Sequence, residues 1–66
     1  MDYREQVFMA VAENLNFTKA AESLFISQPA VTKHIHELES KSGIALFTRK
    51  GNRIFLTQAG EIMYNR

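Results

Sequence analysis

The chain has 66 residues, with eight Lys or Arg against seven Asp or Glu, two histidines and no cysteine. A chain of this length forms one small domain, which buries about 60% of its unfolded surface. The absence of cysteine excludes disulfides and thiolate metal sites, and two histidines cannot complete a structural zinc site, so we expect no metal. There is no apolar run of the roughly 18 residues that a membrane span needs and no signal-peptide core. We expect a cytoplasmic protein.

The charges are unevenly distributed along the chain. Residues 1–26 carry two basic and four acidic side chains, whereas residues 27–66 carry six basic and three acidic ones. This asymmetry is compatible with a basic face directed at phosphates. A randomly solvated surface explains it equally well, because the excess is small.

The first predicted helix spans residues 2–14. Asp2 followed by Glu5 fits a capping box. Apolar residues then recur at helical spacing: Val7, Phe8, Val11, Ala12 and Leu15.

A short second helix follows a break at Asn16 and Phe17. Thr18 is suited to cap it, and we expect it to end near Phe25. Its inward side carries small residues that allow a neighbouring helix to approach closely, together with one leucine: Ala20, Ala21 and Leu24.

The third predicted helix spans about residues 28–41, with Ser27 as its N-cap and Pro29 in its first turn. Gly43 is suited to end it. Three apolar residues predict its buried stripe: Val31, Ile35 and Leu38. We place Ala30, Lys33, His34 and Glu37 on the opposite face, with Thr32 and His36 on the flanks.

Two short strands are predicted next, at 44–49 and 53–57, joined by a Gly51-Asn52 hairpin loop. We expect the hairpin to pack on the helices through Leu46, Ile54 and Leu56, since an isolated hairpin is unstable. Thr57 can cap a last helix over 58–66, whose inward side carries Ala59, Ile62 and Met63. This helix has no stop signal, so we expect it to continue in a longer protein.

The order of elements predicts a mainly α winged helix-turn-helix: three helices, a two-stranded wing and the start of a further helix. Within the chain we distinguish a winged helix-turn-helix domain at residues 1–57 from residues 58–66, which form the beginning of a further helix.

Five short motifs carry a resemblance to a known family. They are Phe17-Thr18-x-Ala20-Ala21-x-x-Leu24, Ser27-Gln28-Pro29-Ala30-Val31-Thr32, Ile35-x-x-Leu38-Glu39, Gly43-x-x-Leu46-Phe47-x-Arg49 and Leu56-Thr57-x-Ala59-Gly60. Together, over about residues 7–60, they resemble the N-terminal DNA-binding domain of LysR-type transcriptional regulators. The resemblance implies a bacterial regulator that is usually a homotetramer. It also implies a dimerising linker helix that begins at Gln58 and a C-terminal domain, absent here, that binds a small-molecule effector.

On this interpretation the third helix reads the major groove of double-stranded DNA. Gln28 can pair with adenine, and Pro29 and Ala30 allow close approach to thymine methyls. Thr32 and Lys33 match positions at which family members contact bases or phosphates. The alternatives are a solvated helix start and a free surface lysine.

Other candidates have two explanations each. His34, where the family commonly has Arg or Gln, either hydrogen-bonds DNA or is a bystander. Thr18, Ser27 and Thr57 can cap helices and can also bind phosphate at helix N-termini, and Thr18 matches a family phosphate contact.

The wing, residues 48–54, supplies Arg49, Lys50 and Arg53 to the flanking backbone or the minor groove. Arg49 either contacts a phosphate or pairs with an acidic side chain. The family usually has an arginine one residue before Arg53, where this chain has Asn52. This leaves open whether Arg53 takes that role.

No arrangement of residues indicates catalysis or a cofactor in this domain. Two other functions compete with the LysR-type interpretation. One is a DNA-binding winged helix of another regulator family; the other is a winged helix that serves as a protein-interaction module, which would require apolar residues on the outer face of the third helix.

Overall fold

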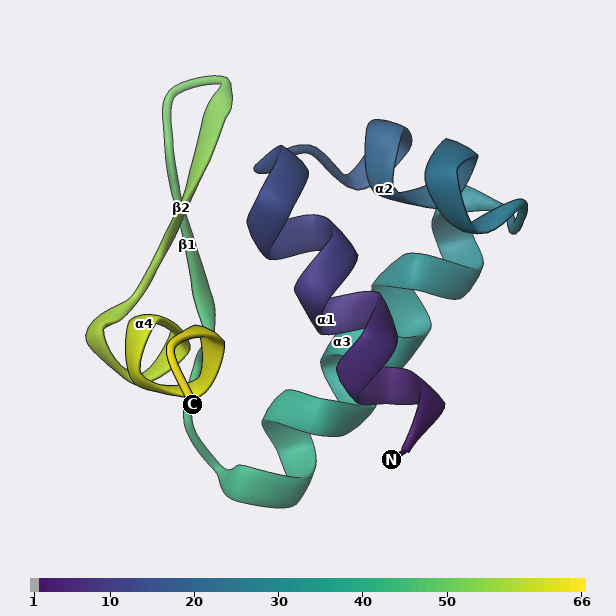
Figure 1. The fold of residues 1–66 in the computed structure, drawn as a ribbon. Helices are drawn as coiled ribbons and strands as arrows, with labels where there is room; N and C mark the ends of the chain where they lie inside the picture. The colour runs from purple at the N-terminus through teal and green to yellow at the C-terminus, as the bar shows by residue number, and fades with distance from the viewer. Residues whose placement is uncertain (1) are drawn as a thin grey trace.

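A computed structural model of the chain describes residues 2–66. It contains, in order, α1 (Tyr3–Asn14), α2 (Phe17–Leu24), α3 (Gln28–Ser42), β1 (Phe47–Lys50), β2 (Arg53–Leu56) and α4 (Gln58–Tyr64). In Figure 1, α1 and α3 cross, α2 lies beside the start of α3, and the hairpin stands on the other side of α1. The predicted mainly α winged helix-turn-helix is confirmed. None of the helices in this part of the chain has the length and hydropathy that a membrane crossing requires.

The core is built around α1. Val7, Phe8 and Val11 of this helix are fully buried. They pack with small residues of α2, the inner stripe of α3 and the inward face of the hairpin: Ala20, Ala21, Val31, Ile35, Leu46 and Ile54. The predicted inward sides of α2 and α3 are therefore confirmed, with Leu24 and Leu38 at the edge of the core.

Two of the predicted helix caps form as expected. The Ser27 hydroxyl accepts the Ala30 N–H at 3.2 Å, and the Thr57 hydroxyl accepts the Gly60 N–H at 3.0 Å. Gly43 ends α3 in the left-handed region, with φ 73°. These local signals set the starts of α3 and α4 and the end of α3.

The first two helices differ from the prediction at their ends. Thr18 does not cap α2; the cap is Asn16, whose side-chain oxygen accepts the Lys19 N–H at 2.8 Å. The Asp2 carboxylate caps α1 by accepting the Arg4 N–H at 2.9 Å, whereas the Glu5 N–H donates to the Asp2 carbonyl oxygen. Leu15 is not part of the core, because it is the left-handed C-cap of α1 and 44% exposed.

The hairpin has the predicted two-residue loop, in which Gly51 has a φ of 60°, and Lys50 pairs with Arg53. Its first strand starts later than predicted, at Phe47. The backbone before it makes other bonds: Leu46 N–H donates to the Glu39 carboxylate at 2.8 Å, and Leu46 C=O accepts the Thr57 N–H at 3.0 Å. Residues 44–46 therefore join the end of α3 to the start of α4 instead of extending the ladder.

The last helix covers Gln58–Tyr64, two residues less than predicted. Ala59 and Met63 pack against the core as expected. Ile62 does not, because its side chain is 61% exposed. The expectation that Ile62 faces inward is wrong.

We predict that Gly60→Ala destabilises the fold by about 3 kcal/mol, at the upper end of the usual range for overpacking. A Cβ at Gly60 would overlap the Leu46 carbonyl oxygen and lie 2.9 Å from Leu56 Cδ2. Gly51→Ala is the control, because its Cβ meets open space and only the left-handed backbone is penalised, by about 1 kcal/mol. Urea denaturation would measure both; equal losses would contradict the crowding at Gly60.

Candidate nucleic-acid interface

The outer face of α3 borders an open groove. Its lining comes almost entirely from this helix: Gln28, Pro29, Thr32, Lys33, His36, Glu37, Ser40 and Lys41, with Arg4 of α1 added. Thr32 and His36 border this groove and also the small cavity on the side of the hairpin, which agrees with their predicted place toward a flank. The angular positions follow from the buried residues Val31 and Ile35, since 100° per residue turns positions 32 and 36 to one side of the helix and position 34 to the other.

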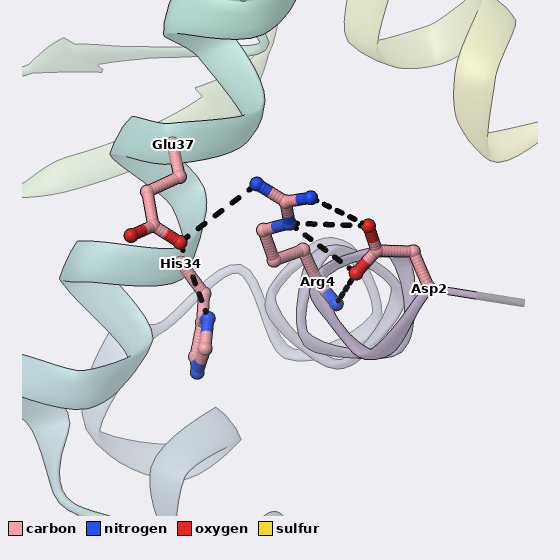
Figure 2. Close-up of polar contacts among 4 residues, drawn as sticks. All are labelled: Asp2, Arg4, His34 and Glu37. Atoms are coloured by element: carbon pink, nitrogen blue, oxygen red, sulfur yellow. Dashed lines mark hydrogen bonds and ion pairs between the residues drawn. The ribbon is translucent and has the colours of Figure 1, made fainter.

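His34 lies on the side of α3 that faces α1, so its predicted place on the outer face is wrong. Its ring meets the Tyr3 ring edge-on, with centroids 5.4 Å apart. Its Nδ1 lies 3.8 Å from a Glu37 carboxylate oxygen, too far for a hydrogen bond. This buried nitrogen, drawn beside Glu37 in Figure 2, has no hydrogen-bond partner among the described residues. Ala30 lies on the same flank.

A second, polar concavity joins three elements that are separate in sequence. Thr18 of α2, Gln28 of α3, and Arg49 and Asn52 of the hairpin region line it. The Thr18 hydroxyl donates to the Gln28 side-chain oxygen at 3.3 Å. The structure thus brings together residues of the second helix, the third helix and the wing that the sequence could place only on separate elements.

Arg49 lies on the hairpin face directed at the helices. It pairs with the buried Ile54, and paired residues share one face of an antiparallel sheet. It also lines a small cavity with Thr32 and His36. Among residues 2–66, no carboxylate lies within ion-pair distance of Arg49. The alternative of an intramolecular ion pair is therefore not found.

Lys50 and Arg53 form a directly opposed cross-strand pair at the wing tip. Like charges in this arrangement repel each other, and within the described chain neither has an acidic partner within 4.0 Å. A nearby polyanion would relieve this repulsion.

Ser27 and Thr57 are caps whose hydroxyl oxygens already accept backbone N–H groups. Thr57 also donates to the Ala45 carbonyl at 2.7 Å. It lies at the end of β2 opposite the wing tip, apart from the concavity formed by Thr18, Gln28 and Arg49. Its hydroxyl therefore has a structural role here.

Arg4 is a cation at this surface that the sequence analysis did not identify. Its guanidinium donates to Asp2 through Nε at 3.2 Å and through Nη2 at 2.7 Å, while Nη1 lies 3.9 Å from Glu37 (Figure 2). Hydrogen bonds from Arg4 lower the pKa of Asp2 to about 2 and, reciprocally, raise the pKa of Arg4. No sequence motif marks Arg4, because the position depends on how α1 crosses α3.

The part of the chain that the structure describes holds no cluster of three or more His, Asp or Glu side chains arranged to bind a metal. His34 and His36 point to different sides of α3, as their spacing predicts.

The fold and this surface define a winged helix-turn-helix protein. Residues 5–61 match the family model described as "Bacterial regulatory helix-turn-helix protein, lysR family". The chain belongs to this family, which confirms the resemblance.

Curated relatives agree with this assignment. The chain is 49% identical over 57 residues to a probable RuBisCO transcriptional regulator from Thalassiosira pseudonana, and the aligned region covers 86% of this chain and 19% of that protein. It is 48% identical over 61 residues to the HTH-type transcriptional regulator CysL of Bacillus subtilis, covering 92% and 20%. The chain thus spans about a fifth of the length of these relatives.

Solved structures share the fold. A LysR-family transcriptional regulator from Eggerthella lenta superposes with a TM-score of 0.94 at 40% identity, covering 98% of this chain and 93% of that one. The DNA-binding domain of BenM in complex with catB site 1 DNA has a TM-score of 0.92 at 36% identity, covering 98% and 73%. The DNA-binding domain of CbnR in complex with DNA has a TM-score of 0.90 at 36% identity, covering 98% of this chain and 76% of that one.

Proposed function

We propose that this chain is a sequence-specific reader of double-stranded DNA in a bacterial, cytoplasmic transcriptional regulator. α3 lies in the major groove, and the hairpin contacts the flanking backbone or the minor groove. The observation that carries the proposal is the joint surface of Thr18, Gln28 and Arg49, where three elements meet around the start of α3. A helix enters a major groove with its N-terminal residues at the base edges, and the two relatives solved with DNA have the same fold.

The position of each interface residue on α2, α3 or the hairpin determines which part of the DNA we expect it to contact. Gln28, Pro29 and Thr32 meet base edges, and Lys33 meets guanine or a phosphate. Ala30, on the flank of the first turn, contributes only the small size that allows close approach. Thr18 and Arg49 contact phosphates on the hairpin side. Lys50 and Arg53 extend the positive charge along the wing, and Asn52 borders the surface where the family usually has arginine. His34 does not enter this proposal, because it faces Tyr3.

A protein-interaction module would need a large apolar patch on the outer face of α3. Apart from Pro29, the residues that line that groove are polar or charged, and they include no Phe, Tyr, Trp, Leu, Ile, Val or Met. This composition favours DNA over a protein partner. Phosphate contacts would position the domain, and base contacts would select the sequence.

We predict that the chain binds a mixed-sequence duplex with a strong salt dependence, of about 0.9 log unit per phosphate contact for each decade of salt. Arg49→Gln should reduce this slope by about 0.9, since it removes one contact. Arg66→Gln is the matched control, because Arg66 lines a different concavity with Met63 and Tyr64 and borders neither the groove along α3 nor the concavity at Arg49. Fluorescence anisotropy over a salt series gives the slopes, and salt-independent binding would refute the proposal.

A second prediction concerns sequence choice. With a site selected from a random duplex pool, Gln28→Ala should reduce the preference for that site over an unrelated duplex by about 1–3 kcal/mol, since one bidentate base contact is lost. Ser40→Ala, further along the same face of α3, serves as the control. An equal loss of affinity on both duplexes would make Gln28 a general contact and not a reader.

We also propose that α4 begins the linker helix through which two copies associate, in a longer protein that carries an effector-binding domain. The exposed Ile62 supports this proposal, because this large apolar residue of α4 is 61% exposed and does not pack against the core.

A chain extended beyond Arg66 through the rest of that helix is expected to be a dimer by light scattering. Ile62→Asp should shift it toward monomer, because a charge would be buried at the interface. Gln58→Asp, at an exposed position of the same helix, should not. A persistent monomer would contradict self-association through this helix.

A further inference from the structure

Among residues 2–66, Arg4 is the one side chain from outside α3 that lines the groove on the outer face of this helix. We propose that Arg4 contacts a DNA phosphate on the side of α3 away from the hairpin, so that a guanidinium flanks this helix on each side. This inference rests on the DNA binding proposed above. The domain would then contact the phosphates of both DNA strands that border the groove, one of them through Arg4 of α1.

The two arginines occupy opposite flanks of the same helix. Arg49 shares a cavity with Thr32 and His36. Arg4 approaches from the other side, where it lies near Glu37 and Lys41 borders the same groove. A major groove is about 12 Å wide and has a phosphate strand along each wall. A helix placed in it therefore benefits from a cation on both flanks.

The guanidinium of Arg4 is held ready for such a contact. Asp2 binds one edge of it, through Nε and Nη2, in the forked geometry that fixes both position and orientation. Nη1, at the opposite edge, donates no hydrogen bond within the described residues and lies 3.9 Å from a Glu37 carboxylate oxygen. A phosphate at about 2.8 Å would be a much stronger partner than this long contact.

Glu37 places a negative charge on the same face, which opposes DNA binding. Its carboxylate borders the groove between Arg4 and His34 (Figure 2) and would repel a phosphate strand. Moving the Arg4 side chain toward the phosphate leaves Glu37 less neutralised. Glu37→Gln should therefore strengthen DNA binding and leave the salt slope unchanged or steeper.

The test is the salt dependence of binding to a fluorescein-labelled, mixed-sequence duplex, measured by anisotropy on the 66-residue chain. Arg4→Gln should lower the slope by about 0.9 and weaken binding roughly five- to tenfold near 0.1 M salt, by the loss of one phosphate contact. Arg4→Lys should restore most of the slope, because lysine still offers a point charge. A role limited to the fork with Asp2 would not be restored by lysine, which cannot form it.

Thermal unfolding separates binding from folding, and Arg66→Gln controls for the loss of one charge. If Arg49→Gln lowers the slope and Arg4→Gln does not, or changes only the melting temperature, Arg4 makes no phosphate contact and the inference fails while the proposed function stands. If the wild-type chain shows no salt-dependent binding, the proposed function itself fails, and this inference with it.

Discussion

The contact of Phe47 with two helices determines where the wing lies, and the interface depends on it. The Phe47 ring packs against Phe8 of α1 at 5.4 Å and against Phe17 of α2 at 6.1 Å. Aromatic pairs at these distances stabilise a fold beyond the area they bury. Because Arg49 follows two residues later on the same face of β1, the aromatic contact also carries Arg49 toward Thr18 and Gln28. A small core thus positions a polar surface assembled from three elements.

Local signals predicted much of the fold, and their failures have identifiable causes. Ser27 and Thr57 were correct caps because each has the only capping side chain at its helix start. At the start of α2, Asn16 and Thr18 could both cap, and the structure uses Asn16, which leaves Phe17 inside the helix and against Phe47. The early start predicted for β1 was wrong because Glu39 and Thr57, both distant in sequence, bind the backbone of residues 45–47.

The candidate site was predictable in composition and less so in orientation. The sequence identified the residues of α3 but placed His34 on the outer face. The predicted stripe of Val31, Ile35 and Leu38, at 100° per residue, already turns position 34 toward a flank, so this error lay in the angular assignment and not in the pattern. Arg4 was not identifiable at all. It lies in the acidic first part of the chain, and its position depends on the crossing of α1 over α3, which no local pattern encodes.

The charges at this surface limit what one copy can do on DNA. Glu37 offsets part of the field of the described cations around α3 and the wing, which are Arg4, Lys33, Lys41, Arg49, Lys50 and Arg53. Since each phosphate contact adds a similar increment to salt-sensitive affinity, the number of these cations limits the affinity that a single domain gains from electrostatics. Two copies joined through the helix that α4 begins would double these contacts and raise the effective concentration of the second domain at its half-site. The weak charge of the domain and the exposed Ile62 on α4 therefore support the same arrangement: a reader that gains affinity by pairing, and so depends on spacing as well as sequence.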